Sequence, residues 1–305
     1  MGRSMRPINV PDAACPDFIA YLDIRRAILR HDFFLEYQPK VSLGSGLIEG
    51  VEALVRWNHR KLGRLAPDVF IPRLERTELI HSLTWSVLDE AVKRCAALHD
   101  QGFLLGVAAN VSPAAVTEAL PRRVDAVLER YRLAPGWLTL EMTQSLPFEN
   151  LSRAHSILNA IHARGVHISL DDFGMGYASL AQLQSLPFDE IKIDKVFVTR
   201  AARSRRDADI VGFVAALGHA MGLRVIVEGV ENRKTMKLMH ELGADAAQGN
   251  YLAPPLPAGD LLAEFPLVSE RARSRIGRVA LDLTDAKSPL TEARSRVEDP
   301  AWGRR

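Results

Sequence analysis

The sequence predicts an α/β protein folded as a modified TIM (β/α)8 barrel with one antiparallel strand. Along the 305 residues, eight short β-rich runs alternate with helical patterns of ten or more residues. Eight is the number of strands that closes such a barrel. The first two runs are separated only by Gly44-Ser45-Gly46, which predicts a hairpin and therefore one strand that runs against the others. A doubly wound open sheet is the alternative fold.

The strand candidates are runs of β-forming residues bounded by turn residues. They span 33–43, 47–57, 104–112, 137–145, 166–174, 190–195, 223–231 and 244–252. The helical stretches between them repeat apolar residues with the period of an α-helix. They span about 19–31, 82–100, 118–131, 151–164, 207–221 and 231–242. Their alternation along the chain is what favours a barrel.

The chain is expected to divide into three segments. Residues 1–20 read as an irregular lead-in, because prolines recur through them, and residues 21–267 as the barrel. After Pro266 the apolar periodicity fades, so 268–305 is expected to be a flexible tail with one short ordered piece at 278–283. No repeat of fixed residue identity stands out.

Composition bounds the function. Hydrophobic residues make up 47% and charged residues 25%, as in ordinary globular proteins. No apolar run approaches the ~20 residues of a membrane span, and the first residues lack a signal-peptide core, so a cytoplasmic location is expected. The net charge of the whole chain is +2. Residues 268–305 alone carry +3, so the rest of the chain carries 2 − 3 = −1. This near-neutral balance implies no basic patch on the barrel for a nucleic-acid polymer. Cys15 and Cys95 provide neither a disulfide framework nor a thiolate metal site.

Polar and charged residues stand where the predicted strands end. They are Glu52, Asn110, Glu141, Asp171, Asp172, Lys192, Glu228 and Gln248. The C-terminal ends of parallel barrel strands open on one face, where active sites are built, so these side chains are expected to converge.

Several carboxylates share a pocket only with a compensating charge, and oxygen ligands favour Mg²⁺, Mn²⁺ or Ca²⁺ over zinc. Two ions ~3.5–4 Å apart would use all five carboxylates, with one acid of the pair Asp171-Asp172 bridging them. Lys192 would orient a nucleophilic water or neutralise a phosphoryl oxygen. The pattern alone indicates a divalent-metal barrel enzyme. A carboxylate-plus-lysine barrel acting on a carbon acid, as in the enolase superfamily, is the alternative.

The tripeptide Glu52-Ala53-Leu54, followed by Val55-Arg56-Trp57, resembles the signature of the EAL-domain family. Seven further motifs occur in the family's order between residues 22 and 265. They are YQPKVSL (37–43), NVSP (110–113), LEMT (140–143), DDFGMGYASL (171–180), LPFDEIKID (186–194), VEGVE (227–231) and QGNYLAPPLP (248–257). The tripeptide alone carries no weight, whereas the ordered set is specific.

The resemblance implies a barrel with one antiparallel strand that uses Mg²⁺ or Mn²⁺ to cut one phosphodiester of the bacterial second messenger cyclic di-GMP, giving linear pGpG, with Ca²⁺ as an inhibitor. It implies a homodimer, and a regulatory protein partner is expected. The implied metal ligands are Glu52, Asn110, Glu141, Asp171, Asp172 and Glu228. The implied catalytic residues are Lys192, Gln248 and Glu228, and the implied substrate contacts are Gln38, Leu54 and Arg56.

The chain departs from the family pattern at three positions. Gln144 stands where active members carry a second Glu, Met175 where Thr is usual, and Ala178 where Ser is usual. The charge lost at Gln144 weakens a predicted anchor for the loop after the two aspartates. Two alternatives to catalysis therefore stay open, a cyclic di-GMP receptor that does not hydrolyse and a protein-binding scaffold.

Overall fold

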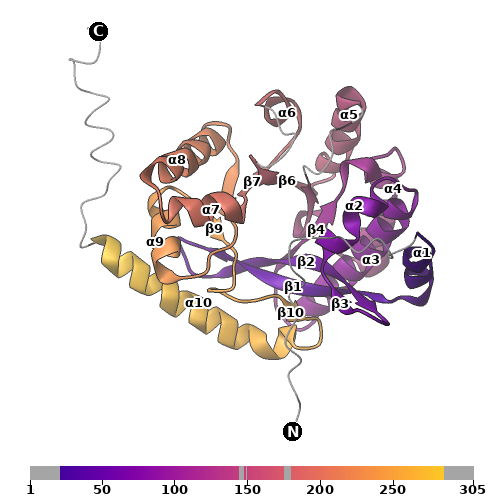
Figure 1. The fold of residues 1–305 in the computed structure, drawn as a ribbon, viewed down its shortest axis with the longest axis horizontal. Coiled ribbons are helices and arrows are strands. Elements are labelled where there is room, and N and C mark those ends of the chain that lie inside the picture. The colour runs from indigo at the N-terminus through magenta and orange to yellow at the C-terminus, as the bar shows by residue number, and fades with distance from the viewer. Residues whose placement is uncertain (1–20, 144–147, 149, 175–179, 285–305) are drawn as a thin grey trace.

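The computed structural model describes residues 21–143, 148, 150–174 and 180–284 (Figure 1). Its sheet closes into a barrel in the order β1-β9-β8-β7-β6-β5-β4-β2, and β2 pairs back with β1. The barrel strands are β1 (Phe33–Ser42), β2 (Ile48–His59), β4 (Gly106–Val111), β5 (Leu138–Met142), β6 (His167–Phe173), β7 (Glu190–Ile193), β8 (Arg224–Val227) and β9 (Ala246–Ala247). Each lies within a predicted run or overlaps it, and closure rules out the open-sheet alternative.

The predicted hairpin is confirmed. β1 runs antiparallel to both of its barrel neighbours, β2 and β9, whereas every other pair in the barrel is parallel. Two short strands not predicted from the sequence lie beside this hairpin: β3 (Gly63–Leu65) pairs with the end of β2, and β10 (Leu256–Pro257) pairs with β1. The barrel wall is therefore extended on the side of β1 and β2.

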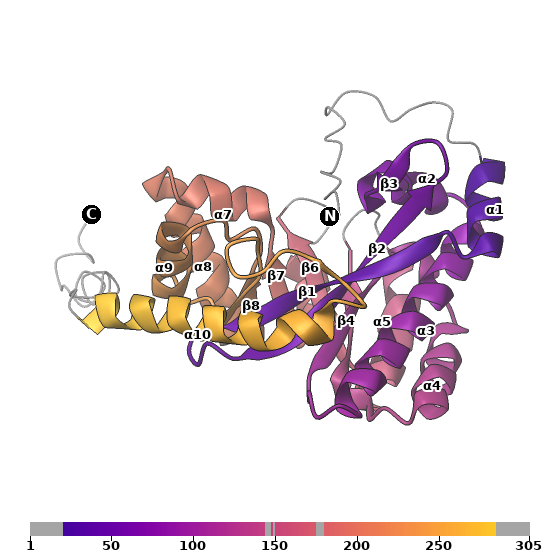
Figure 2. The same ribbon diagram turned by 90° about the horizontal axis from the view of Figure 1, so that it is seen from below.

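The helices lie outside the barrel, as Figures 1 and 2 show. They are α1 (Tyr21–Arg30), α2 (Ile71–Leu74), α3 (Leu79–His99), α4 (Leu120–Tyr131), α5 (Leu151–His162), α6 (Leu180–Ser185), α7 (Lys195–Ala201), α8 (Arg205–Ala220), α9 (Arg233–Glu241) and α10 (Leu261–Thr284). Several helices begin with a polar N-cap residue. The side chains of Asn150, Ser204 and Asn232 accept hydrogen bonds from the backbone amides of Arg153, Asp207 and Thr235, respectively. Such caps satisfy amides that have no partner inside the helix.

Four helices end in the same short turn, His-x-x-Gly. The turns are His99–Gly102, His162–Gly165, His219–Gly222 and His240–Gly243. Each glycine has a positive φ, between 77° and 94°, a conformation that closes helix C-termini and favours glycine. A histidine in the last turn also suits the negative end of the helix dipole.

The prediction of a flexible tail from residue 268 is wrong for 268–284, because α10 continues to Thr284. Val268, Ala272 and Ile276 recur at helical spacing and are buried, so the helix has an apolar stripe that packs on the barrel. Pro266 lies inside α10 without ending it. Residues 1–20 and 285–305 lie outside the described residues. No helix in the described part of the chain has the length and apolar character needed to cross a membrane.

Candidate active site

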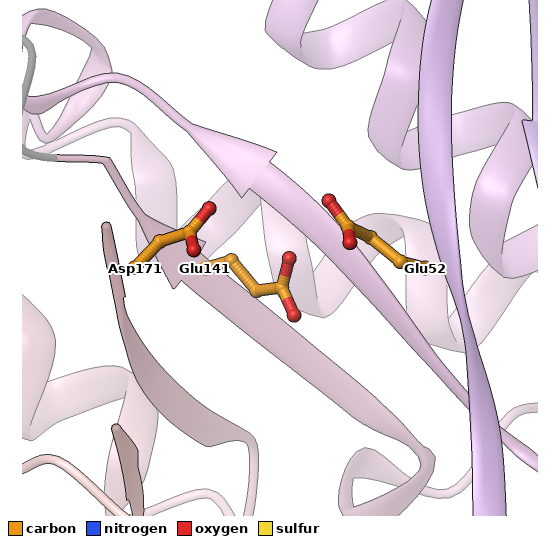
Figure 3. A group of neighbouring side chains, drawn as sticks. All are labelled: Glu52, Glu141 and Asp171. Atoms are coloured by element: carbon orange, nitrogen blue, oxygen red, sulfur yellow. The ribbon is translucent and has the colours of Figure 1, made fainter. Parts of the chain in front are cut away.

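The acidic side chains predicted from the strand ends converge at one end of the barrel. Figure 3 shows the carboxylates of Glu52, Glu141 and Asp171 pointing toward one another from three different strands, β2, β5 and β6. Their oxygens lie within 4.8 Å of one another. A second set meeting the same limit contains Asp171, Asp172 and Glu228. Asp171 belongs to both sets and therefore joins them into one acidic cluster.

Lys192 lies at the centre of this cluster and is fully buried. Its Nζ is 3.2 Å from Glu52 Oε2 and 3.0 Å from Glu141 Oε2. The same nitrogen is 3.2 Å from Asp171 Oδ1 and 2.6 Å from Glu228 Oε1. A buried charge is tolerated when it is paired in this way, and one lysine thereby binds acids from four places in the sequence.

The pKa values show that one lysine does not balance these acids. Burial and then the Asp171 charge raise the pKa of Asp172 to about 7. Burial also raises the pKa of Glu228 to about 8, although Lys192 opposes it. The pKa of Glu141 lies well above its usual value because of burial and the Glu52 charge. Ionising all of them together requires additional positive charge.

Glu52 is the exception among these acids. Burial alone would raise its pKa, but the Lys192 charge and hydrogen bonds from Gln248 and Asn110 outweigh burial and lower it to about 2. Gln248 Nε2 lies 2.6 Å from Glu52 Oε2, and Asn110 Nδ2 lies 2.7 Å from Glu52 Oε1. Because Asn110 donates through its nitrogen, its carbonyl oxygen remains available to a cation.

The donor set fits a divalent metal. It consists of oxygen atoms, the type that Mg²⁺ and Mn²⁺ prefer. Within the described residues, Glu141 Oε1 and Gln248 Oε1 are buried and have no hydrogen-bond partner. Buried polar atoms are rarely left unpaired, so such atoms in an acidic cluster point to a ligand. Six residues would hold the metal: Glu52, Asn110, Glu141, Asp171, Asp172 and Glu228.

Asp172 owes its position to an irregular strand end. Its φ is 52°, in the left-handed region that non-glycine residues seldom adopt. The pairing of β6 with β7 shifts register between Leu170 and Phe173, and the Asp172 amide donates to Asp171 Oδ1 at 2.9 Å. This bulge brings two consecutive carboxylates to the same cluster, which a regular strand would send to opposite faces.

The three predicted substrate contacts have different surroundings. Gln38 accepts a hydrogen bond from Gln248 Nε2 at 3.0 Å and donates to the Ala253 carbonyl at 3.1 Å. Leu54 lines a cavity of about 310 Å³ that begins at the acidic cluster and extends between β2, α2 and α3. Arg56 is not among the residues lining that cavity, and its Nε donates to Glu36 Oε2 at 3.0 Å.

Sequence reasoning missed two buried groups beside the site. Glu36, on β1, pairs with both Arg56 and Arg64. Lys40, also on β1, has its Nζ 3.1 Å from Glu190 Oε1 and 3.8 Å from Glu141 Oε1. Alternate residues of β1 from Glu36 to Lys40 are polar, and this alternation was the available signal. It reads as a solvent-facing side in most strands, whereas here it faces other buried polar groups.

Comparison with known proteins then decides the family. The sequence model of the EAL domain family matches residues 22–255 of this chain. The chain belongs to the EAL-domain family. EAL phosphodiesterases depend on metal, and the acidic cluster of this EAL domain is a group that could bind it.

This EAL domain is similar to two curated proteins of Pseudomonas aeruginosa. It is 40% identical over 243 residues to the bifunctional diguanylate cyclase/cyclic di-GMP phosphodiesterase MucR, covering 79% of this chain and 36% of MucR. It is 34% identical over 238 residues to the cyclic di-GMP phosphodiesterase RocR, covering 77% of this chain and 60% of RocR. The chain thus spans about a third of the first relative and less than two thirds of the second.

Solved structures agree with the fold. The phosphodiesterase PaMucR in complex with c-di-GMP superimposes on this EAL domain with a TM-score of 0.74 and 38% identity, covering 79% of this chain and 98% of that one. An EAL-domain protein from Listeria monocytogenes gives a TM-score of 0.71 at 28% identity, covering 82% and 99%. The departures from the family pattern at Gln144, Met175 and Ala178 lie outside the described residues.

Proposed function

We propose that this EAL domain hydrolyses one phosphodiester bond of cyclic di-GMP to give linear pGpG, and so lowers the level of this second messenger. The observation that carries the proposal is the complete set of five carboxylates, two amides and Lys192 gathered beside one cavity. The similarity to MucR and RocR, which are both cyclic di-GMP phosphodiesterases, supports the substrate and the reaction.

The proposed metal is Mg²⁺ or Mn²⁺, two ions held by the six oxygen ligands. Bound there, such ions supply charge for the phosphoryl oxygens and lower the pKa of the attacking water. Lys192 keeps four of the carboxylates together and places a positive charge at the reacting phosphate. Gln248 offers its unpaired Oε1 to orient the water. Glu228 is proposed as a catalytic residue as well as a metal ligand, and metal binding displaces the proton that burial favours on it in the metal-free protein.

The cavity beside the cluster suits a flat nucleotide base. Its walls include apolar side chains of α2 and α3, among them Ile71, Pro72 and Leu83, together with Leu54 from the EAL tripeptide. Apolar walls with a few polar groups are typical of small-molecule sites. Arg56 and Gln38 are proposed to contact the phosphate, for which a planar guanidinium is well suited. Glu36 then serves to hold Arg56 in place.

Product analysis tests the proposal. Purified protein incubated with cyclic di-GMP and Mg²⁺ or Mn²⁺ should give pGpG, detected by chromatography. Ca²⁺ is proposed to occupy the site and inhibit, because its looser coordination activates water poorly. Tight binding of cyclic di-GMP in Ca²⁺ without pGpG formation in Mg²⁺ would instead indicate a receptor, and no binding in either ion would indicate a scaffold.

The homodimer and the regulatory protein partner remain part of the proposal, as does a cytoplasmic location. Light scattering of the purified chain across a range of concentrations measures directly whether it forms the homodimer. A mass equal to one 33.8 kDa chain at all concentrations would remove the dimer from the proposal.

A further inference from the structure

The C-terminal helix α10 (Leu261–Thr284) follows the segment that the family model matches, which ends at residue 255. In both ribbon views it runs along one side of the barrel next to α9 (Figures 1 and 2). Phe265 packs edge-on against Phe103 with ring centroids 5.3 Å apart. A Cβ atom at Gly46, in the β1–β2 hairpin, would lie 3.0 Å from the Cα of Arg273. The helix is therefore closely packed on the barrel.

Arg275 joins α10 to the loop that follows β9. Its guanidinium lies over the ring of Tyr251, 4.4 Å from the centroid. Its Nη1 donates a hydrogen bond to the Leu252 carbonyl at 3.3 Å. A cation stacked on an aromatic ring and bonded to the adjacent carbonyl fixes both the side chain and the backbone of the loop.

The same loop, residues 248–253, begins with Gln248 of the candidate active site. Gln248 donates to Glu52 Oε2 at 2.6 Å, and the Ala253 carbonyl accepts from Gln38 at 3.1 Å. The Tyr251 amide donates to the Val230 carbonyl at 3.0 Å, and the Val230 amide donates to the Gln248 carbonyl at 3.1 Å. The loop is one packed unit, with the acidic cluster on one side and Arg275 on the other.

Gly249 makes this packing unusually close. A Cβ atom there would lie 2.3 Å from the Val230 amide nitrogen, so the two backbones are in direct contact. Val230 is two residues beyond Glu228, so the loop also borders the segment that carries this ligand. These contacts connect Tyr251 to Gln248 through Val230, so a shift of Tyr251 is expected to move Gln248.

We propose that Arg275 is a positioning residue for Gln248, and that turnover at the site depends on the C-terminal helix through this contact. The part of this proposal that concerns turnover rests on the function proposed above. The helix stays docked without Arg275, because Phe265, Val268, Ala272 and Ile276 remain buried against the barrel. Arg275 thus acts on the loop and does not hold α10 in place.

The test compares Arg275→Ala with Arg271→Ala, an exposed arginine of the same helix, and with Arg275→Lys. Arg275→Ala should lower kcat for cyclic di-GMP about three- to tenfold, with a smaller change in KM. It should also speed amide hydrogen exchange in 249–253. Arg271→Ala should change neither quantity, and Arg275→Lys should recover part of the loss because it keeps the cation. Unchanged exchange and kcat in Arg275→Ala would overturn the proposal.

A double-mutant cycle with Gln248→Ala asks whether Arg275 acts through Gln248. If it does, Arg275→Ala should lower the remaining activity of Gln248→Ala by less than about twofold. Independent effects that multiply would contradict the proposed route. If the wild type did not turn over cyclic di-GMP, the proposed function would fail on its own, and amide exchange in 249–253, which needs no substrate, would still decide whether α10 holds this loop.

Discussion

At the C-terminal ends of its strands the barrel gathers five carboxylates around one lysine, whereas at the opposite end acidic side chains each have their own donor. Glu49 lies 2.6 Å from Arg224. Asp189 accepts hydrogen bonds from the Ile168 amide at 2.8 Å and from His162 at 3.0 Å. The first end carries more acids than its one lysine balances, whereas the acids described here at the second end are paired with donors.

The second end repeats one device. Asp245 accepts from the Val225 amide at 2.8 Å and from His219 at 3.0 Å, just as Asp189 does from Ile168 and His162. In both cases the histidine begins a His-x-x-Gly turn and the amide belongs to the next strand. The aspartate therefore joins the end of a helix to the start of a strand. The comparison indicates that one end is built for stability and the other for binding and chemistry at some cost in stability.

The largest expected effect is at the acidic end. Asp172→Asn removes a proposed metal charge, so pGpG formation should fall by roughly a thousandfold or more. In metal-free buffer its melting temperature should be equal to or higher than wild type, because burial and Asp171 disfavour the charged form of Asp172. Initial rates and calorimetry measure the two quantities. A folded Asp172→Asn protein with near wild-type kcat would remove Asp172 from the ligand set.

Lys40 lies between the two ends, with Glu141 on one side and Glu190 on the other. Lys40→Met should reduce the free energy of unfolding by about 3 kcal/mol, since it leaves the buried Glu190 carboxylate without its nearest partner, while Glu141 keeps Lys192. Lys93→Met is the matched control, because Lys93 pairs with Glu90 at 3.1 Å on the surface and should cost below about 0.5 kcal/mol. Equal losses in urea unfolding would show that burial of the Lys40 pair is unimportant.

Asp189→Ala tests the stabilising end. It leaves the Ile168 amide and His162 without their acceptor, so the free energy of unfolding should fall by about 1–2 kcal/mol. The kcat of the folded fraction should stay within about twofold of wild type, because no proposed ligand contacts Asp189. Urea unfolding and rates per folded molecule check both. A large loss of kcat at full folding would contradict the division between the two ends.

The metal requirement should depend on pH. The pKa values of Asp172 and Glu228 are raised to about 7 and about 8, so metal must displace protons from them at neutral pH. The half-saturating Mg²⁺ concentration should therefore fall as pH rises from 6.5 to 8.5, by up to about tenfold per unit for each proton displaced. A Mg²⁺ requirement that is constant over this range would show that both acids are already ionised without metal.

The smallest expected effect concerns the departures from the family pattern. Gln144→Glu combined with Met175→Thr should lower the half-saturating Mg²⁺ concentration, raise kcat, or both, by restoring a charged anchor and a hydroxyl partner. Gln144→Glu alone should help less. Mg²⁺ titrations of wild type, both single variants and the double variant measure this. A double variant no better than wild type would mean that these residues are neutral variation.

Much of the fold could be predicted because local residue patterns indicate where strands and helices alternate. The short Gly44-Ser45-Gly46 connection likewise indicates the hairpin. The convergence of the candidate site followed from one topological fact, that parallel strands end on the same face. The roles assigned to those residues stay predictions.

Other features depend on contacts between distant parts of the chain. Lys40 and Glu36 sit on a strand whose polar side faces buried partners, so the alternation of β1 suggests solvent. The bulge at Asp172 depends on pairing with β7. The helix beyond Pro266 depends on packing against the barrel, because its apolar stripe is narrow and lies among many charges. The residue periodicity within a single segment cannot predict these contacts between distant segments.

We infer that the acidic end of the barrel is a metal-dependent hydrolytic site. The most direct measurement is the initial rate of pGpG formation by wild-type protein stripped with EDTA, verified free of metal, and titrated with Mg²⁺. The stripped protein should show no turnover, and activity should return in a saturable way with Mg²⁺. Undiminished hydrolysis of cyclic di-GMP by the metal-free protein would contradict this inference.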